Sequence, residues 1–450
     1  MMPLNLCSLA AYVRRQSSGL DFKVLDSERM SLNVTEIVEE VKLYCPDLIG
    51  ITSNTCVFDV VKNITGLIKK EAPQIPIALG GAHVSALPER ALVESGADFA
   101  VMGEGEMTLS EVVKKLELGR TDWSNIKGLA YLKDGRPVVN PPATLIQDLD
   151  ILPFPARDLI DNKCYSAAPT KRVSLGPITL ISTGRGCPYD CGFCAQRAIW
   201  GRKNRMRSPD SVVAEIEECV SRYDIHSFNI TDELFTSDLE RVAAISGLIR
   251  KRKLRVRWVC SARPERLDLE TFKTMYAAGC REVSFGVESG SQKILERINK
   301  NTNLDEIRRV IGNAKKAGIT THASYIFGYI GEDDNTIRET IRFAKKLNTH
   351  VAAFFIASPL PGSRLYKEAM EKKYIDPGSA WANYSPLSNM KSVMSLPGLS
   401  SEKIRMWHRK AMTDYYLRPR YILLKIFSIR HLYDVANIFA GIKMLFGLRK

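Results

Sequence analysis

β-rich and helical runs alternate along the chain in two blocks, and this alternation constrains the fold more than any other feature. Parallel strands need long crossover connections, usually helices, so such alternation is typical of α/β domains. The first block, residues 1–139, predicts a doubly wound parallel sheet that ends in a hairpin around Asp134 and Gly135. The expected strands are "FKVLD" (22–26), "DLIGITS" (47–53), "IPIALGG" (75–81) and "FAVMG" (99–103), and the expected helices are 35–44, 58–71 and 105–117.

A proline-rich segment over residues 140–172 separates the two blocks and predicts an extended linker. The second block, residues 173–395, has six strand-like runs and predicts an incomplete (β/α)6 barrel with its chemistry at the carboxyl ends of the strands. Residues 396–450 lack strand signals and predict a basic helical region. The expected barrel strands are 178–182, 228–232, 255–260, 282–287, 321–327 and 351–356, with helices at 209–222, 238–251 and 333–347.

The loop after the first barrel strand, "GRGCPYDCGFCAQRAIWG" (184–201), contains Cys187, Cys191 and Cys194 in a C-x3-C-x2-C arrangement. Zinc sites usually pair C-x2-C with a second such pair, and the chain has none. An iron–sulfur cluster held by four cysteines needs one more ligand. Two interpretations remain: ordinary loop cysteines, or three ligands that leave one metal position open to a substrate.

The spacing, with an aromatic residue before the last cysteine, resembles the signature of the radical S-adenosylmethionine (SAM) superfamily. The resemblance implies a [4Fe–4S] cluster on Cys187, Cys191 and Cys194. SAM would bind the fourth iron, and its reductive cleavage would give methionine and a 5′-deoxyadenosyl radical that abstracts hydrogen from an unactivated carbon. Phe193 would shield the cluster, and a ferredoxin or flavodoxin would supply the electron.

Further motifs of this family follow at the ends of later strands. "NITDELF" (229–235) makes Asp232 and Glu233 candidates for binding the ammonium of SAM, because a positive amine favours a carboxylate. "SFGVESGS" (284–291) is similar to the ribose motif, in which Glu288 would accept from the sugar hydroxyls with support from Ser289. The other matches are "YIFGYIGE" (325–332) for adenine, "SPLPGSRLY" (358–366) for the closing loop, and Arg263 as a SAM-facing residue.

The first block resembles the cobalamin-binding domain of one large radical SAM class. Ser53, Gly80 and Gly81 would lie in ligand-side loops, where glycine lets the backbone approach a bulky ligand, and residues 103–106 would form a third loop. Many such domains ligate cobalt through the His of D-x-H-x-x-G; here that position is Glu28, so no His of this motif would bind cobalt. His83 is predicted to be structural. The usual opening strand has no counterpart, which predicts a shortened or weakened domain.

The formal net charge of +14 is concentrated at the C-terminal end, where residues 401–450 hold eleven Lys or Arg against three acids. This region predicts either a helical cap with a solvated basic face or an amphipathic segment that contacts a membrane surface. The chain shows no secretory signal and no long apolar run, and its ten cysteines are scattered. We therefore expect a cytoplasmic protein without a disulfide framework.

The combined features predict a cobalamin-dependent radical SAM enzyme that methylates or otherwise modifies a small molecule. The layout resembles both the hopanoid methylases and the anaerobic magnesium-protoporphyrin ester cyclases, so cyclisation or oxidation without methyl transfer stays open. A tRNA methylthiotransferase would carry a second cluster and a small β domain, which the dispersed N-terminal cysteines and the helical tail do not favour. No nucleic acid partner is expected. A non-catalytic cofactor sensor conflicts with the full set of SAM motifs.

Overall fold

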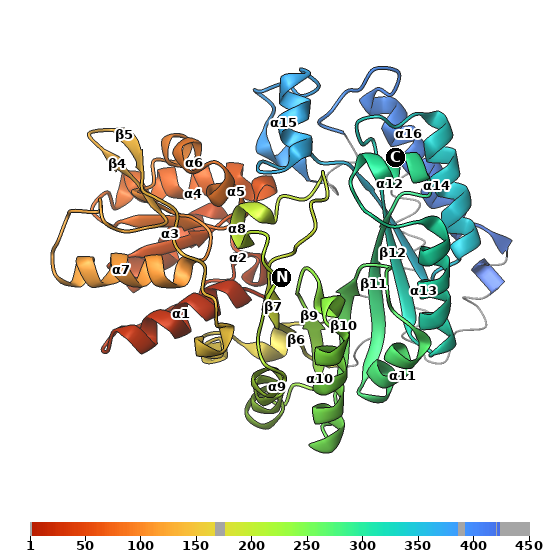
Figure 1. Ribbon diagram of the computed structural model, residues 1–450. Helices are drawn as coiled ribbons and strands as arrows, with labels where there is room; N and C mark the ends of the chain where they lie inside the picture. Colours follow the sequence, from red (N-terminus) through yellow and green to blue (C-terminus); the bar gives the residue numbers. More distant parts are fainter. Residues whose placement is uncertain (1, 167–175, 386–391, 420, 424–450) are drawn as a thin grey trace.

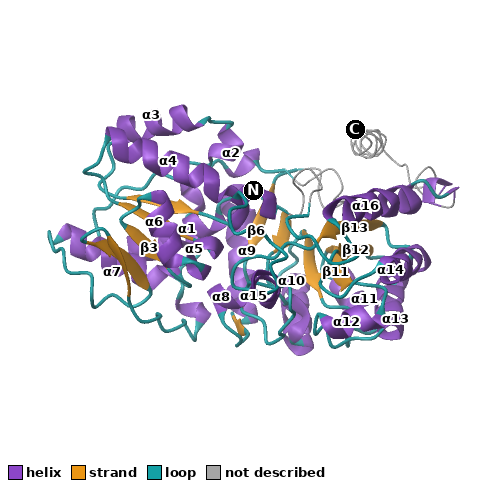
Figure 2. Cartoon of the chain, turned by 90° about the horizontal axis from the view of Figure 1, so that it is seen from above, coloured by secondary structure: helices purple, strands orange, loops and turns teal. Residues whose placement is uncertain are grey.

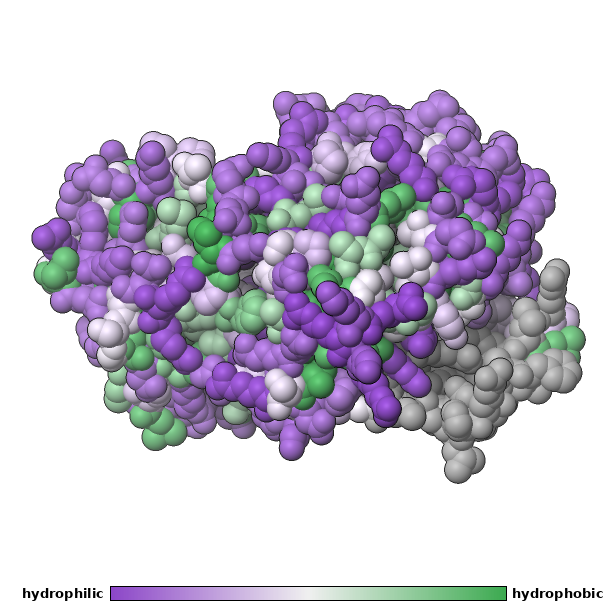
Figure 3. Space-filling view, turned by 60° about the horizontal axis from the view of Figure 1, so that its bottom comes forward, coloured by the Kyte–Doolittle hydropathy of each residue, from purple (hydrophilic) through white to green (hydrophobic). Residues whose placement is uncertain are grey.

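Two sheets of different construction lie side by side in the computed structural model, each covered by its own helices (Figures 1 and 2). The structure describes residues 2–166, 176–385, 392–419 and 421–423. Within these residues we find no helix that is long and apolar enough to cross a membrane. The face of the molecule in Figure 3 is mostly hydrophilic, and its hydrophobic residues form small separate groups.

The N-terminal sheet has five strands in the order β1-β2-β3-β4-β5, parallel from β1 to β3 and antiparallel from β3 to β5. Helix α3 packs against α4 on one side and α1 against α7 on another. The strands are β1 (Ile49–Thr52), β2 (Ile77–Gly80), β3 (Phe99–Val101), β4 (Leu129–Lys133) and β5 (Arg136–Val139). The helices are α1 (Leu4–Gln16), α2 (Ser27–Met30), α3 (Val34–Tyr44), α4 (Phe58–Glu71), α5 (Ala82–Ala86), α6 (Pro88–Ser95) and α7 (Gly105–Glu117).

The predicted strand over residues 22–26 is wrong, because this segment is extended but belongs to no sheet. An extended segment becomes a strand only where a neighbour supplies partners for its N–H and C=O groups. Residues 22–26 make side-chain contacts but no backbone pairing with a neighbouring strand. Phe22 packs beside Ala10 and Ala11 of α1, and Leu25 packs against the main core. The other three predicted strands, the hairpin and the three predicted helices of this block are confirmed.

The described part of the segment between the domains is mostly extended, and near its middle it is anchored to both domains. Ala156 donates its N–H to the carbonyl of Cys7 in α1 at 3.0 Å. Arg157 is buried against the barrel, where it donates to the carbonyl of Leu180 at 2.8 Å and pairs with Glu215 at 2.7 Å. This segment contains three short 3-10 helices, η2 (Leu149–Ile151), η3 (Arg157–Leu159) and η4 (Asn162–Cys164).

The second sheet contains six parallel strands in the order β13-β12-β11-β10-β9-β6, so each strand pairs with its neighbour along the chain. This confirms the predicted partial barrel. The strands are β6 (Ile178–Ile181), β9 (Ser227–Ile230), β10 (Arg257–Ala262), β11 (Cys280–Glu288), β12 (Thr320–Phe327) and β13 (Val351–Ile356). The helices are α8 (Arg197–Trp200), α9 (Pro209–Tyr223), α10 (Leu239–Lys251), α11 (Leu269–Ala277), α12 (Gln292–Arg297), α13 (Leu304–Lys316), α14 (Asp334–Leu347) and α15 (Arg364–Glu371).

Helix α16 (Ser401–Tyr416) covers the end of this sheet at β13. Its side chains satisfy backbone groups that β12 does not pair: the hydroxyl of Tyr416 accepts from the N–H of Ala352 and donates to its carbonyl. The Tyr415 hydroxyl donates to the carbonyl of Thr349 at 2.6 Å. An open edge strand is thereby protected. The helical prediction for this stretch is confirmed, whereas its continuation over residues 424–450 lies outside the described residues.

Candidate functional site

The cysteine loop rises from a short ribbon in which β7 (Gly184–Arg185) pairs antiparallel with β8 (Arg205–Met206). Two glycines make the loop possible. Gly186 has φ +92°, and a Cβ there would lie 2.3 Å from the carbonyl oxygen of Lys203; at Gly192 it would lie 2.1 Å from the Tyr329 hydroxyl. Gly192 also donates to Ile298 O and accepts from Leu365 N, both at 2.8 Å. The loop is therefore fixed between the ends of α12 and α15.

The three thiols of Cys187, Cys191 and Cys194 are half-buried. The pKa values of Cys187 and Cys194 are raised, and the neighbouring Cys191 contributes to both shifts. Burial is the main cause, and it raises the pKa of Cys194 to about 11. No three His, Cys, Asp or Glu side chains among the described residues converge as ligands of a single ion would. A [4Fe–4S] cluster does not require such convergence, because each of its cysteines binds a different iron. The donor set fits a cluster with three protein thiolates.

Phe193 lies inside this loop, where it is partly buried and packs against the main core. Arg263, just beyond β10, contacts the loop directly, with Nη1 3.3 Å from the Sγ of Cys191. The structure thus brings both predicted residues to the cysteines. The shielding role of Phe193 and the SAM-facing role of Arg263 stay predictions.

The two acids that follow β9 have different surroundings. Asp232 is buried and accepts from the N–H of Thr183 at 2.6 Å and from its hydroxyl, so it joins the ends of β9 and β6. Glu233 is less buried and lies near Cys187 and Cys194; burial and the charge of Asp232 raise its pKa. Glu233 is therefore the acid of this pair that is better placed to meet a ligand at the cysteine loop.

The predicted ribose pair also divides into two roles. Glu288 is buried at the end of β11, has φ +66°, and accepts from the ammonium of Lys300 at 2.9 Å. Ser289 is fully buried and contacts the Thr340 hydroxyl of α14 at 3.0 Å. Sequence reasoning missed Lys300, which follows α12 in a turn that no motif marks. A buried carboxylate needs such a partner, but the sequence does not show which cation supplies it.

Glu332 organises the loop after β12, a role that sequence reasoning also missed. Its Oε2 accepts from the N–H groups of Gly328 at 2.6 Å and Tyr329 at 3.3 Å. Burial raises the pKa of Glu332 to about 8. This carboxyl group is therefore protonated at neutral pH, and it closes the predicted adenine-binding stretch upon itself.

The predicted cobalamin loops lie together at the carboxyl ends of β1 and β2. Ser53 is buried and donates its N–H to the carbonyl of Gly80 at 2.8 Å. Gly81 has φ +98°, and a Cβ there would lie 2.4 Å from the carbonyl oxygen of Ser53. The side chain of His83 is buried between the rings of Phe58 and Trp381, with centroids at 4.1 and 4.6 Å. These loops offer backbone and small side chains, which suits a large ligand. The burial of His83 among aromatic rings is what a structural role predicts.

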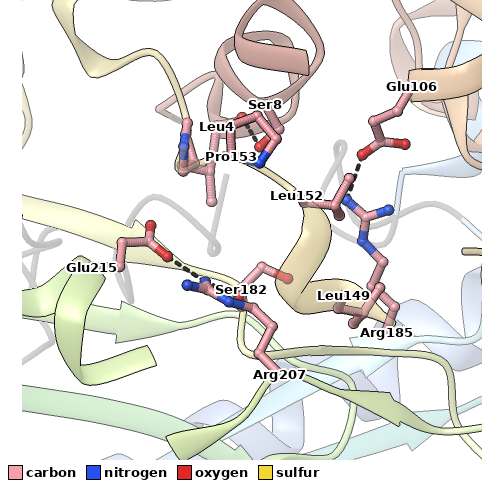
Figure 4. A pocket seen from close by; sticks show the side chains of 11 residues that line it. Leu4, Ser8, Glu106, Leu149, Leu152, Pro153, Ser182, Arg185, Arg207 and Glu215 are labelled. Atoms are coloured by element: carbon pink, nitrogen blue, oxygen red, sulfur yellow. Dashed lines mark hydrogen bonds and ion pairs between the residues drawn. The ribbon is translucent and has the colours of Figure 1, made fainter. Parts of the chain in front are cut away.

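The third loop, residues 103–106, turns its carboxylates toward the barrel domain. Arg185 of β7 pairs with Glu104 at 3.0 Å and with Glu106 at 2.5 Å, and Arg205 of β8 pairs with Glu104 at 2.9 Å. We call these four residues the domain clasp. Figure 4 shows the Arg185–Glu106 contact beside a pocket lined by both domains and the linker. The sequence prediction of a ligand-side loop did not anticipate that both carboxylates pair with arginines.

The domain clasp continues toward Glu233, one of the two acids predicted to bind SAM. The guanidinium of Arg185 lies 5.0 Å from the centroid of the Trp200 ring, and the side chain of Trp200 is near enough to Glu233 to lower the pKa of that acid against the effect of burial. Helix α8, which contains Trp200, packs against α5 of the N-terminal domain. The cysteine loop and the predicted cobalamin loops therefore form one continuous contact.

Comparisons with known proteins agree with this arrangement. The family model of the radical SAM superfamily matches residues 181–344, and that of the B12 binding domain matches residues 1–113. An uncharacterized methyltransferase of Pyrococcus horikoshii is 33% identical over 95% of this chain and 90% of its own length. The chain belongs to the cobalamin-binding radical SAM enzymes. Its cofactors are a [4Fe–4S] cluster, SAM and cobalamin.

One further relative and one solved structure are also similar to this chain. The anaerobic magnesium-protoporphyrin IX monomethyl ester cyclase of Rubrivivax gelatinosus is 30% identical over 82% of this chain and 66% of its own length. The radical SAM methyltransferase TsrM of Kitasatospora setae, solved with cobalamin and a [4Fe–4S] cluster, superposes with a TM-score of 0.72 at 21% identity. That superposition covers 93% of this chain and 87% of TsrM. It shows the shared fold.

Proposed function

We propose that this enzyme is a methyltransferase that places a methyl group on an unactivated carbon of a small molecule. The observation that supports this best is the direct contact between the cysteine loop and the cobalamin-side loops. A Cβ at Gly103 would lie 3.5 Å from the carbonyl oxygen of Ile199, and one at Gly362 would lie 3.0 Å from Ala198 and 3.4 Å from Ala86. Methyl transfer between two cofactors requires their sites to be neighbours.

The chain's own residues bind and orient the cofactors in this proposal. Cys187, Cys191 and Cys194 would hold the cluster, Glu233 the ammonium of SAM and Glu288 its ribose, with Asp232, Ser289 and Phe193 as their supports. Ser53, Gly80 and Gly81 would bind cobalamin in the domain over residues 1–139. When bound, the cluster supplies the electron that cleaves SAM, and cobalamin supplies the methyl group.

A cyclase or oxidase without methyl transfer is the second candidate, because the cyclase of Rubrivivax gelatinosus is 30% identical. The lengths of the two alignments favour the methyltransferase. The alignment with the Pyrococcus horikoshii methyltransferase spans 90% of that protein, whereas the alignment with the cyclase spans 66% of the cyclase.

The product spectrum tests the proposal. The anaerobically reconstituted enzyme with SAM, cobalamin and reductant should form S-adenosylhomocysteine beside 5′-deoxyadenosine when the substrate is present. Deoxyadenosine without S-adenosylhomocysteine would favour the cyclase or oxidase. Iron and cobalt contents of the purified protein check the loading of both sites.

An acidic ferredoxin or flavodoxin is the electron donor that the charges of the cysteine loop support. Asp190 lies beside Cys191 and contacts Arg197, Arg202 and Arg364, all of which are exposed. Three cations around one carboxylate leave a positive rim, which would attract an acidic partner. We also propose a cytoplasmic location. For the basic C-terminal region, a peripheral membrane contact is the alternative to a helical cap with a solvated basic face.

A further inference from the structure

Arg263 is held in a single orientation beside the cysteine loop. Its guanidinium makes four hydrogen bonds: Nη1 to the Sγ of Cys191 at 3.3 Å, Nε and Nη2 to one oxygen of Glu265 at 3.0 and 2.6 Å, and Nη2 to the carbonyl of Lys300. The guanidinium carbon lies 3.7 Å from the centroid of the Tyr189 ring. The residue is 8% exposed. Little freedom remains for this side chain.

The same contacts connect the cysteine loop to the predicted ribose carboxylate. Lys300 accepts from Arg263 through its backbone carbonyl, and its side-chain ammonium pairs with Glu288. Glu265 also accepts from the Tyr189 hydroxyl at 3.3 Å. Arg263 is thus fixed from the side of the loop and from the side of β11, and its N–H remains directed at the sulfur of Cys191.

The charge on Arg263 is permanent, because a guanidinium is not deprotonated in proteins. Glu265 neutralises part of that charge but contacts the nitrogens that do not face the sulfur. The thiol position therefore has one N–H donor and a nearby cation. Reduction potentials of iron–sulfur clusters depend on hydrogen bonds to the sulfurs, on net charge and on solvent exposure.

We propose that Arg263 is a positioning residue that raises the reduction potential of the cluster by donating an N–H···S bond to Cys191. This inference rests on the proposed function, since it requires a cluster on the three cysteines. In the step concerned, the cluster takes one electron from an external reductant, and no bond forms or breaks. Arg263 keeps all its protons, and its N–H bond and charge stabilise the additional negative charge on the sulfur ligand.

The test is a redox titration of the reconstituted enzyme with dithionite, followed by the electron paramagnetic resonance (EPR) signal of the reduced cluster, without SAM or cobalamin. At a fixed potential, Arg263→Gln should lower the ratio of reduced to oxidised cluster about tenfold, equivalent to a midpoint about 59 mV lower for one electron. Arg263→Lys keeps the positive charge but not the planar N–H donor, so we expect a smaller decrease in the ratio of reduced to oxidised cluster than in Arg263→Gln.

Glu265→Gln provides a change of opposite sign. It removes the negative partner of Arg263, so the ratio of reduced to oxidised cluster at the same potential should increase several-fold. The control is Arg281→Gln, the same charge change at the start of β11, where the guanidinium of Arg281 donates to the carbonyls of Tyr276 and Cys280 and lies over the Tyr276 ring. That variant should titrate like the parent enzyme.

The outcomes separate this inference from the proposed function. A parent enzyme that binds no iron would contradict the proposed function. Full iron and sulfide with unchanged ratios in Arg263→Gln and Glu265→Gln would overturn the role of Arg263 alone. If Arg263→Gln binds no cluster, the other two variants test the role of Arg263. A lower ratio of reduced to oxidised cluster in Arg263→Lys and a higher ratio in Glu265→Gln would support it, and unchanged ratios in both would overturn it. A variant that titrates normally but loses the EPR change on adding SAM would assign Arg263 to SAM instead.

Discussion

The two cofactor regions of the molecule are built from different kinds of residue. Around the cysteine loop, charged side chains are buried and paired, as in the contacts of Arg263 with Glu265 and of Lys300 with Glu288. The loops after β1 and β2 contribute glycines and backbone, and their only ring, His83, is enclosed by aromatic neighbours. The barrel region thus presents paired charges to its ligands, whereas the N-terminal loops present mainly backbone and small side chains.

The largest effect should come from the cysteines, and only from the three in the cysteine loop. Cys191→Ala removes a thiolate that no other described residue near the loop can replace, so cluster iron and 5′-deoxyadenosine should both fall to the level of the blank. The matched change in the other region is Cys56→Ala, a half-buried thiol outside the motif. It should leave both measurements unchanged. An intact cluster in Cys191→Ala would refute the ligand assignment.

The domain clasp should show the next largest effect, because it joins the two regions. Arg185→Gln leaves Glu104 and Glu106 without one of their buried partners, which should destabilise the fold by about 3 kcal/mol in urea unfolding. Adding Glu106→Gln should recover part of this loss, since the second charge is then removed. Additive effects in the double variant would mean that the pair does not interact in solution.

Sequence reasoning worked where the signal is local. The six barrel strands are apolar runs of the right length, and the cysteine motif occupies eight residues, so both were predicted. It failed where a partner is remote. Residues 22–26 have a strand-like composition but no neighbouring strand, and Arg185 meets Glu104 and Glu106 across 81 and 79 residues of chain. Nothing in the sequence records which domain faces meet.

A pH effect should appear at Glu332 and not in the N-terminal loops. Its folded-state pKa is about 8, above the ordinary 4.5, because burial favours the neutral form. The folded state then holds a proton that the unfolded state has released, so this contribution is complete below pH 4.5 and is lost as the pH rises to about 8. The slope is up to about 1.4 kcal/mol per pH unit. Urea unfolding at pH 5.5, 7.0 and 8.5 should show Glu332→Gln to be less pH-dependent than the parent.

The smallest effect should result from substitution of His83, and the EPR spectrum of bound cobalamin is the measurement. Burial lowers the pKa of His83 to about 4, so the ring is neutral, and its Nδ1 lies 3.3 Å from the Thr55 hydroxyl. The other nitrogen, Nε2, is buried and has no hydrogen-bond partner among the described residues. The ring stacks on Phe58 and meets Trp381 edge-on. To ligate a metal, the ring would have to leave these contacts.

We therefore expect His83→Gln to leave the EPR spectrum of the cob(II)alamin-loaded enzyme unchanged, including its nitrogen splittings. Thr55→Val removes the hydroxyl that contacts Nδ1 of His83, and it serves as the control because it should give the same spectrum. Loss of a nitrogen splitting in His83→Gln alone would identify His83 as a cobalt ligand. The N-terminal region would then act through a side chain as the barrel does, and the contrast between the two regions would fail.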